Sequence, residues 1–183
     1  MVKSGDGKKR YGTPHTGYML LRAELRHVVN NLENYVMHQI HGEAGAELDE
    51  ALRSSAVNLD QILALHAKYL GRMRDRCLLH QRAAVVADTV RKILDLALRF
   101  QVLFPRFSQA HADAAVAPPG DLKAFERVRQ CEAGLSEIRG DLRRCTRLLV
   151  VVLEKVVSRG FHPHLEDLLV RLSFNSYFSR AEH

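Results

Sequence analysis

The sequence lacks the features that mark a membrane-spanning or secreted protein. No apolar run approaches the length of about 18 residues that a transmembrane helix needs, and the longest block, residues 148–153, is followed at once by Glu154 and Lys155. The N-terminal stretch MVKSGDGKKRYG has none of the apolar core of a secretory signal. Cysteine is scarce, and an odd number of three favours reduced, packed thiols in an intracellular protein.

Catalytic and cofactor motifs are also missing. The chain has no glycine-rich phosphate loop after a strand and no GxSxG, HExxH or CxxC pattern. His38 and His41 share a helix face, but a zinc site needs a third and a fourth ligand, which the sequence does not supply at a usable spacing. Cys77 follows a basic stretch that could lower the pKa of its thiol, although a packed thiol before Leu78 and Leu79 is the simpler interpretation. We expect no enzyme, no metal and no cofactor.

A dense basic cluster is absent as well. The formal net charge of +6, from 27 Lys and Arg against 21 Asp and Glu, favours acidic partners in general. A nucleic-acid surface would usually combine clustered basic residues with aromatic ones. Here the basic residues are spread over separate segments, such as 8–10, 72–76 and 143–144. We interpret them as solvated helix faces and expect no nucleic-acid partner.

The apolar residues of the chain recur with the period of an α-helix. They do not alternate with polar residues as in a β-strand, and the sequence has no internal repeat. The apolar share of 46% is enough for a core. Asn58, with Gln61 three residues later, and Asp121 are predicted N-caps, and Gly160 with Pro163 beyond it marks a helix end. The i, i+3, i+4, i+7 spacing of apolar residues predicts helices over residues 17–40, 47–56, 59–79, 83–104, 122–159 and 164–172. The predicted class is all-α, an antiparallel bundle of about five to six helices.

Two segments are predicted to lie outside the helices. Residues 1–14 form a polar, glycine-containing tail that we expect to be disordered. Pro105 should end the helix before it, because proline cannot continue the hydrogen-bond ladder, and residues 105–120 should then be a mobile loop. The predicted core includes Leu25, Leu32, Ile62, Tyr69, Ile93, Phe100, Leu149 and Leu169.

Three asparagines stand at the centre of the first predicted helix. Asparagine is a poor helix former, and each one costs roughly half a kcal/mol relative to alanine. Arg22, Arg26, Asn30 and Asn34 are spaced four residues apart and therefore form one ridge. The ridge is either structural, with buried amides bridging to a neighbouring helix or loop, or a recognition surface facing a partner. Asn31 is turned by about 100° from Asn30 toward the apolar side, so we expect it to be a structural amide.

This helix resembles the signature helix of the gamma-tubulin complex component family. The segment LRAELRHVVNNLENYVM is similar to the family pattern of LR, a few residues, and then FVNNLQYYIM. Residues 58–70, 77–79 and 94–100 resemble family segments in the same order, and LLVRLSFNSYFS at 168–179 resembles the closing motif. The chain departs from the family at Gly45, where a tryptophan is usual, and at Ser173, where an aspartate is usual. The residues that match the signature helix by position are Arg22, His27, Val29, Asn30, Asn31, Leu32, Tyr35 and Met37.

The resemblance implies a helical fold and a binding function. In this family the C-terminal helical domain binds gamma-tubulin, and the N-terminal domain aligns the subunits into a ring or spiral that templates microtubules. Residues 15–179 would be the last part of that C-terminal domain. The implied partners are gamma-tubulin and other complex components, without nucleic acid or membrane, and the implied location is the cytoplasm at microtubule organising centres and spindle poles. The candidate contact residues are Arg22, Arg26, Asn30, Asn34 and Asn175.

Two other functions remain open on the sequence. A generic helical adaptor would dock a partner helix in a groove between its own helices. A nucleic-acid binder would use the arginine-rich faces, and its binding would weaken steeply with salt.

Overall fold

The computed structural model describes residues 14–55, 58–79, 83–118, 121–160 and 164–173, and every element in these ranges is an α-helix. The predicted all-α class is therefore confirmed. In the described part of the chain none of the helices is long and apolar enough to cross a bilayer. The helices are α1 (Pro14–His41), α2 (Glu43–Ser55), α3 (Leu59–Arg76), α4 (Ala84–Val116), α5 (Leu122–Ser158) and α6 (Leu165–Ser173).

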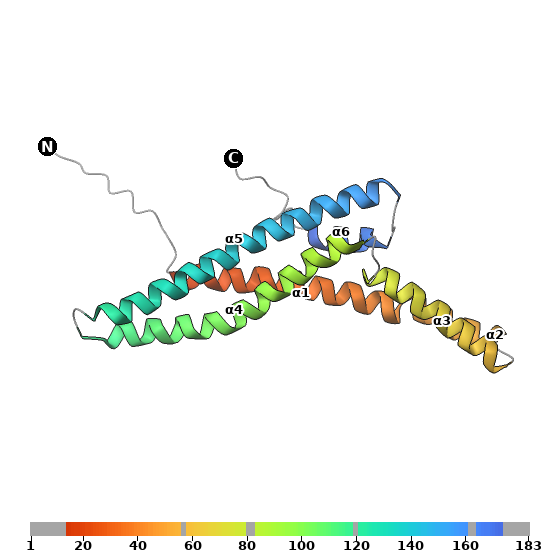
Figure 1. Ribbon diagram of the computed structural model, residues 1–183, viewed down its shortest axis with the longest axis horizontal. Helices are drawn as coiled ribbons and strands as arrows, with labels where there is room; N and C mark the ends of the chain where they lie inside the picture. The colour runs from red at the N-terminus through yellow and green to blue at the C-terminus, as the bar shows by residue number, and fades with distance from the viewer. Residues whose placement is uncertain (1–13, 56–57, 80–82, 119–120, 161–163, 174–183) are drawn as a thin grey trace.

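The long helices α4 and α5 form an antiparallel hairpin that gives the molecule its elongated shape (Figure 1). Helix α1 lies along this hairpin, and the short α6 packs against α1 and α5. Helices α2 and α3 continue beyond one end of α1 as a second, smaller hairpin, away from the tip where α4 meets α5 (Figure 1). Among the described helices, α3 packs only against α2 and α1.

The hydrophobic core lies where α1, α4, α5 and α6 meet. Five of the residues predicted for it are confirmed as buried, and they are Leu25, Leu32, Ile93, Phe100 and Leu149. Leu169 is half-buried against the core, and Tyr69 is also half-buried. The prediction for Ile62 was wrong, since its side chain is 42% exposed on α3, a helix with no buried residue. The contacts that α3 makes with α2 and α1 therefore leave part of its apolar surface exposed to solvent.

The predicted helix caps are confirmed. The Asn58 side chain accepts a hydrogen bond from the backbone N–H of Gln61 at 3.0 Å, and Asp121 accepts from the backbone N–H groups of Lys123 and Ala124. These side chains satisfy N–H groups that the first turn of a helix leaves without a partner. Beyond the end of α5, Gly160 has φ +71°, the left-handed conformation that glycine adopts at little cost.

The prediction that Pro105 ends a helix was wrong. Helix α4 continues through this proline to Val116, so residues 105–116 are helical and not a loop. Proline within a helix costs about 3 kcal/mol. The cost is offset because Phe107 and Ala110, two and five residues beyond it, are buried, and the Phe107 ring meets that of Tyr18 on α1 at 5.0 Å between centroids. Pro105 and Gln101, whose carbonyl loses its partner N–H, are both exposed, so water can replace the missing bond.

Helix α3 ends three residues earlier than predicted, in a Schellman motif. The backbone N–H of Leu79 donates to the Arg74 carbonyl at 2.9 Å, and that of Leu78 donates to the Asp75 carbonyl. Leu78 occupies the left-handed position with φ +64°, which costs a non-glycine residue about 1–2 kcal/mol. Its side chain is buried in the core, and this burial compensates for the backbone strain.

Three predictions fall partly or wholly outside the described residues. The polar tail was predicted over residues 1–14, of which Pro14 is the first residue of α1 and residues 1–13 lie outside the described ranges. Residues 119–120 of the predicted loop and Asn175 also lie outside them.

Candidate partner-binding surface

Helix α1 presents the predicted ridge to solvent. Arg22, Arg26, Asn30 and Asn34 are all exposed, and within the described part of the chain the structure records no hydrogen bond or ion pair for any of them. The structural interpretation required amides buried against a neighbouring helix. The exposure of both asparagines removes that interpretation and leaves their cost in helix propensity without any compensation inside the described structure.

The opposite side of α1 explains why the ridge must face outward. The inward side chains repeat every three or four residues, and all are almost fully buried: Leu21, Leu25, Val28, Leu32 and Tyr35. Removing this stripe from water stabilises the bundle by roughly 1.5–3 kcal/mol per large side chain, far more than the asparagines cost. The core contacts therefore fix the rotation of α1 about its own axis, and with it the direction of the ridge.

The N-terminal end of α1 is attached to α5 by a small polar cluster. The Arg139 guanidinium donates a hydrogen bond to the Gly17 carbonyl and lies over the Tyr18 ring, 5.3 Å from its centroid. The Tyr18 hydroxyl donates to the Glu132 carbonyl at 3.5 Å. Burial, and then the charge of Glu132, raise the pKa of Tyr18 above its ordinary value, while Arg139 opposes them. The cluster holds the ridge at a fixed place on the bundle.

Asn31 is a structural amide, but of a more local kind than predicted. It is half-buried, and its amide nitrogen lies 3.1 Å from Nε2 of His27, one turn earlier on the same helix. A pair at i, i+4 stabilises a helix by about 0.2–0.5 kcal/mol, which is comparable to the propensity cost of one asparagine. The contact with His27 thus offsets the helix-propensity cost of Asn31 within α1. No contact recorded for the described residues offsets the same cost for Asn30 and Asn34.

The ridge belongs to a wider exposed face that the sequence interpretation missed. Met19 and Met37, 41% and 47% exposed, lie on the same side of α1 as Arg26 and Asn30, because they are about two or three whole helical turns away from them. Glu33 is exposed between them. We call Met19, Arg22, Arg26, Asn30, Glu33, Asn34 and Met37 the outer face of α1. Their shared spacing was visible in the sequence, but methionine is usually assigned to a core.

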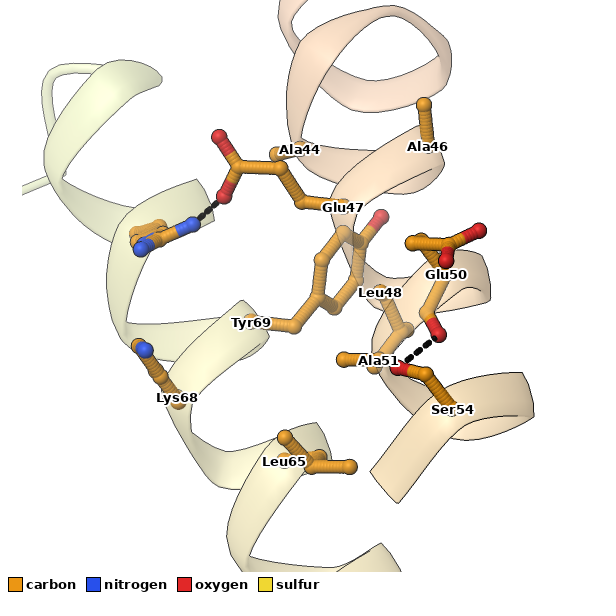
Figure 2. Close-up of a pocket in the computed structure, with 11 residues that line it drawn as sticks. Ala44, Ala46, Glu47, Leu48, Glu50, Ala51, Ser54, Leu65, Lys68 and Tyr69 are labelled. Atoms are coloured by element: carbon orange, nitrogen blue, oxygen red, sulfur yellow. Dashed lines mark hydrogen bonds and ion pairs between the residues drawn. The ribbon is translucent and has the colours of Figure 1, made fainter. Parts of the chain in front are cut away.

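A second candidate surface is the groove between α2 and α3, with a volume of about 730 Å³. Figure 2 shows the Tyr69 ring projecting from α3 toward α2, with Leu48 and Ala51 on the facing side. An ion pair between Glu47 and Arg72 bridges the two helices at the edge of the groove (Figure 2). The walls are mainly apolar, and charged side chains stand at the edge.

Among the described residues, burial raises the pKa of each titratable group whose pKa is clearly shifted. Burial raises the pKa of the Cys77 and Cys145 thiols, which favours the protonated and unreactive form, so the interpretation of Cys77 as a packed thiol is supported. The three cysteines are free and half-buried. Within the described residues, no group of three or more His, Cys, Asp or Glu side chains could hold a metal ion.

Comparison with known proteins places this arrangement in a family. A family model described as gamma tubulin complex component C-terminal matches residues 3–178. Gamma-tubulin complex component 5 of Macaca fascicularis is 35% identical over 153 residues, covering 84% of this chain and 18% of that protein. Gamma-tubulin complex component 6 of Homo sapiens is 31% identical over 162 residues, covering 88% of this chain and 8% of that protein. The chain therefore spans less than a fifth of the length of these relatives.

Proposed function

Because the chain belongs to the gamma-tubulin complex component family, through its C-terminal domain, we propose that it is a non-enzymatic module that binds gamma-tubulin. In this proposal it acts within a microtubule-nucleating complex, together with other gamma-tubulin complex components, in the cytoplasm at microtubule organising centres and spindle poles. The similarity to components 5 and 6 over most of the chain supports this proposal.

The exposed ridge of α1 is the observation that supports a direct contact. Two guanidinium groups and two amides stand in line on a rigid helix, and this helix carries the motif that resembles the family signature. Guanidinium groups form strong, directional hydrogen bonds with carboxylates, and the net charge of +6 suits an acidic partner of the tubulin kind. The exposed methionines at both ends of the outer face add polarisable apolar contact area that adapts to a partner.

The proposal is tested by a double substitution on the ridge, Arg26→Ala with Asn30→Ala. Both side chains are exposed, so the helicity and the melting temperature should stay nearly unchanged. If the ridge is in the contact, the affinity for purified gamma-tubulin, measured by surface plasmon resonance, should fall about tenfold or more, since interface anchors usually contribute over 1 kcal/mol each.

A matched control is Arg127→Ala with Gln130→Ala, which removes one guanidinium and one amide from an exposed face of α5. This variant should bind as the wild type does. A second control is Asn31→Ala, which loses only a contact within α1 and should change the free energy of unfolding by less than about half a kcal/mol. Wild-type affinity in the Arg26/Asn30 variant would place the contact elsewhere.

The groove between α2 and α3 carries the alternative function, a generic adaptor that docks a partner helix. Its apolar walls and charged edge fit the groove side of such an interaction. Leu65→Arg, introduced in the wall of the groove, distinguishes the two proposals. It should leave gamma-tubulin binding unchanged if the outer face of α1 is the contact surface.

A further inference from the structure

Helix α3 carries a row of regularly spaced side chains of which three leucines are largely exposed to solvent. Leu59, Leu63 and Leu70 are 69%, 57% and 52% exposed. Together with His66 and Met73 they repeat at intervals of four, three, four and three residues, which is the spacing of a coiled-coil seam. We call Leu59, Leu63, His66, Leu70 and Met73 the α3 seam. A second helix that packs along such a seam removes its apolar side chains from water, and this burial stabilises the pair of helices.

The three exposed leucines of the seam are turned away from the contacts that α3 makes with α2. His66, whose ring stacks on that of Tyr69 at 6.4 Å between centroids, and the half-buried Met73 form the edge of the seam that borders those contacts. Helix α3 packs against α2 through Leu65, Tyr69 and Arg72, which line the groove of Figure 2. At 100° per residue, Leu65 points about 160° away from Leu63 around the helix, and Tyr69 points about 100° away from Leu70. The small hairpin of α2 and α3 lies at one end of the molecule (Figure 1), where a second helix can approach the seam.

One flank of the seam has a charge pattern that complements itself. Asp60 and Arg74 lie on the same flank, and both are exposed. They are separated by 14 residues, or about 21 Å of helix. Ala67 stands midway between them, and Gly71 follows it on the same flank. A Cβ atom added at Gly71 would meet no atom within 4 Å, so this part of the flank is open to close approach.

We propose that a second copy of this chain occupies the α3 seam, with the two α3 helices antiparallel around a two-fold axis near Ala67. In this arrangement Asp60 of each copy faces Arg74 of the other, whereas a parallel pair would set like charges against each other. The seam side chains of the two copies alternate along the interface, because reflection about residue 67 places all of them except Leu59 between two of their counterparts. The small side chain of Ala67 then lies where the helices come closest.

The contact is expected to be weak. Helix α3 has 18 residues, about 27 Å of length, which offers a smaller area than a standard protein–protein interface. A dissociation constant on the order of 10–100 μM is consistent with an interface of this size. The association goes beyond the proposed function, because it uses α3 and leaves the outer face of α1 open.

The experiment is sedimentation velocity of the full chain over concentrations that span this dissociation constant. The wild type should shift from monomer to dimer. Leu63→Glu with Leu70→Glu should remain monomeric. The matched control, Leu98→Glu with Val102→Glu, makes the same change at a pair of exposed apolar residues on α4 and should dimerise as the wild type does. Circular dichroism of each variant checks that the helices are retained.

A charge exchange tests the antiparallel register. Asp60→Arg or Arg74→Asp alone should weaken the dimer roughly three- to tenfold, since each change creates two repulsive pairs. The two changes together should restore wild-type dimerisation. Three results would overturn the proposal. The chain could stay monomeric at every concentration, the Leu63/Leu70 change could leave the dimer unaffected, or the double charge exchange could fail to restore dimerisation. The Arg26/Asn30 variant should still dimerise, so failure of gamma-tubulin binding and failure of self-association are separable.

Discussion

Replacing Tyr35 with phenylalanine removes a hydroxyl that connects α1 to the end of α3. The Tyr35 side chain is 1% exposed, and its hydroxyl donates a hydrogen bond of 2.7 Å to the Arg76 carbonyl. Arg76 is the last residue of α3, and the carbonyl groups at a helix end have no partner inside the helix. The aromatic ring, and with it the packing of the core, is retained in the variant.

The expected loss follows from the hydrogen bond alone. A fully buried carbonyl left without its donor costs about 1–3 kcal/mol, and the smaller value applies where water can reach the carbonyl. The bond to the Arg76 carbonyl is part-buried, so the loss should lie in the lower part of this range. We expect Tyr35→Phe to reduce the free energy of unfolding by about 1–2 kcal/mol. For a chain of this size that corresponds to a decrease of about 2–8 °C in melting temperature.

The pH dependence gives a second, independent signature. Burial, as the largest cause, raises the pKa of Tyr35 far above its ordinary value in the folded chain. The contribution of the neutral hydroxyl to stability is therefore complete below about pH 10, the pKa of an unfolded tyrosine, and is lost progressively above it. Phenylalanine has no proton to lose. The difference in melting temperature between the wild type and the variant should shrink as the pH rises from about 10 to about 11.

Thermal unfolding followed by circular dichroism at about pH 7 and about pH 11 measures both effects. Tyr18, whose pKa burial also raises, is present in both proteins and contributes equally to each. Equal melting temperatures at neutral pH would show that the hydroxyl makes no useful bond to the Arg76 carbonyl. A difference that grows in alkali would refute the argument from burial.

Two further predictions concern the core and the helix contacts. Leu32→Ala should lower the free energy of unfolding by about 2–5 kcal/mol in urea denaturation, because a cavity remains in the core; a loss below about half a kcal/mol would contradict the burial of Leu32. Gly71→Ala and Gly134→Ala form a matched pair. A Cβ at Gly71 has open space, whereas one at Gly134 would lie 2.7 Å from Cδ2 of Leu103 on α4. Gly71→Ala should therefore stabilise the monomer by up to about 1 kcal/mol, while Gly134→Ala should gain less or lose stability. An equal gain at both sites would show that α4 and α5 are not in close contact there.

The sequence showed that the residues of the candidate site share one face of a helix, but not whether that face is exposed to solvent. The four-residue intervals of Arg22, Arg26, Asn30 and Asn34 showed that they share a face. Whether that face meets solvent or a neighbouring helix depends on which elements pack around α1. The same limit applies to Met19 and Met37, because the sequence did not show that these apolar side chains lie on the exposed side.

Local chemistry allowed the sequence by itself to determine the helices, their caps and most of the core. An α-helix is held by bonds between residues four apart, and a cap acts within three residues, so Asn58 and Asp121 required no knowledge of the rest of the chain. Tertiary structure alone decided the course of α4 beyond Pro105, the exposure of Ile62 and the direction of the α1 ridge. Each of these depends on contacts between residues far apart in the chain, such as Tyr18 with Phe107. The free energy of those contacts exceeds the local preferences of single residues.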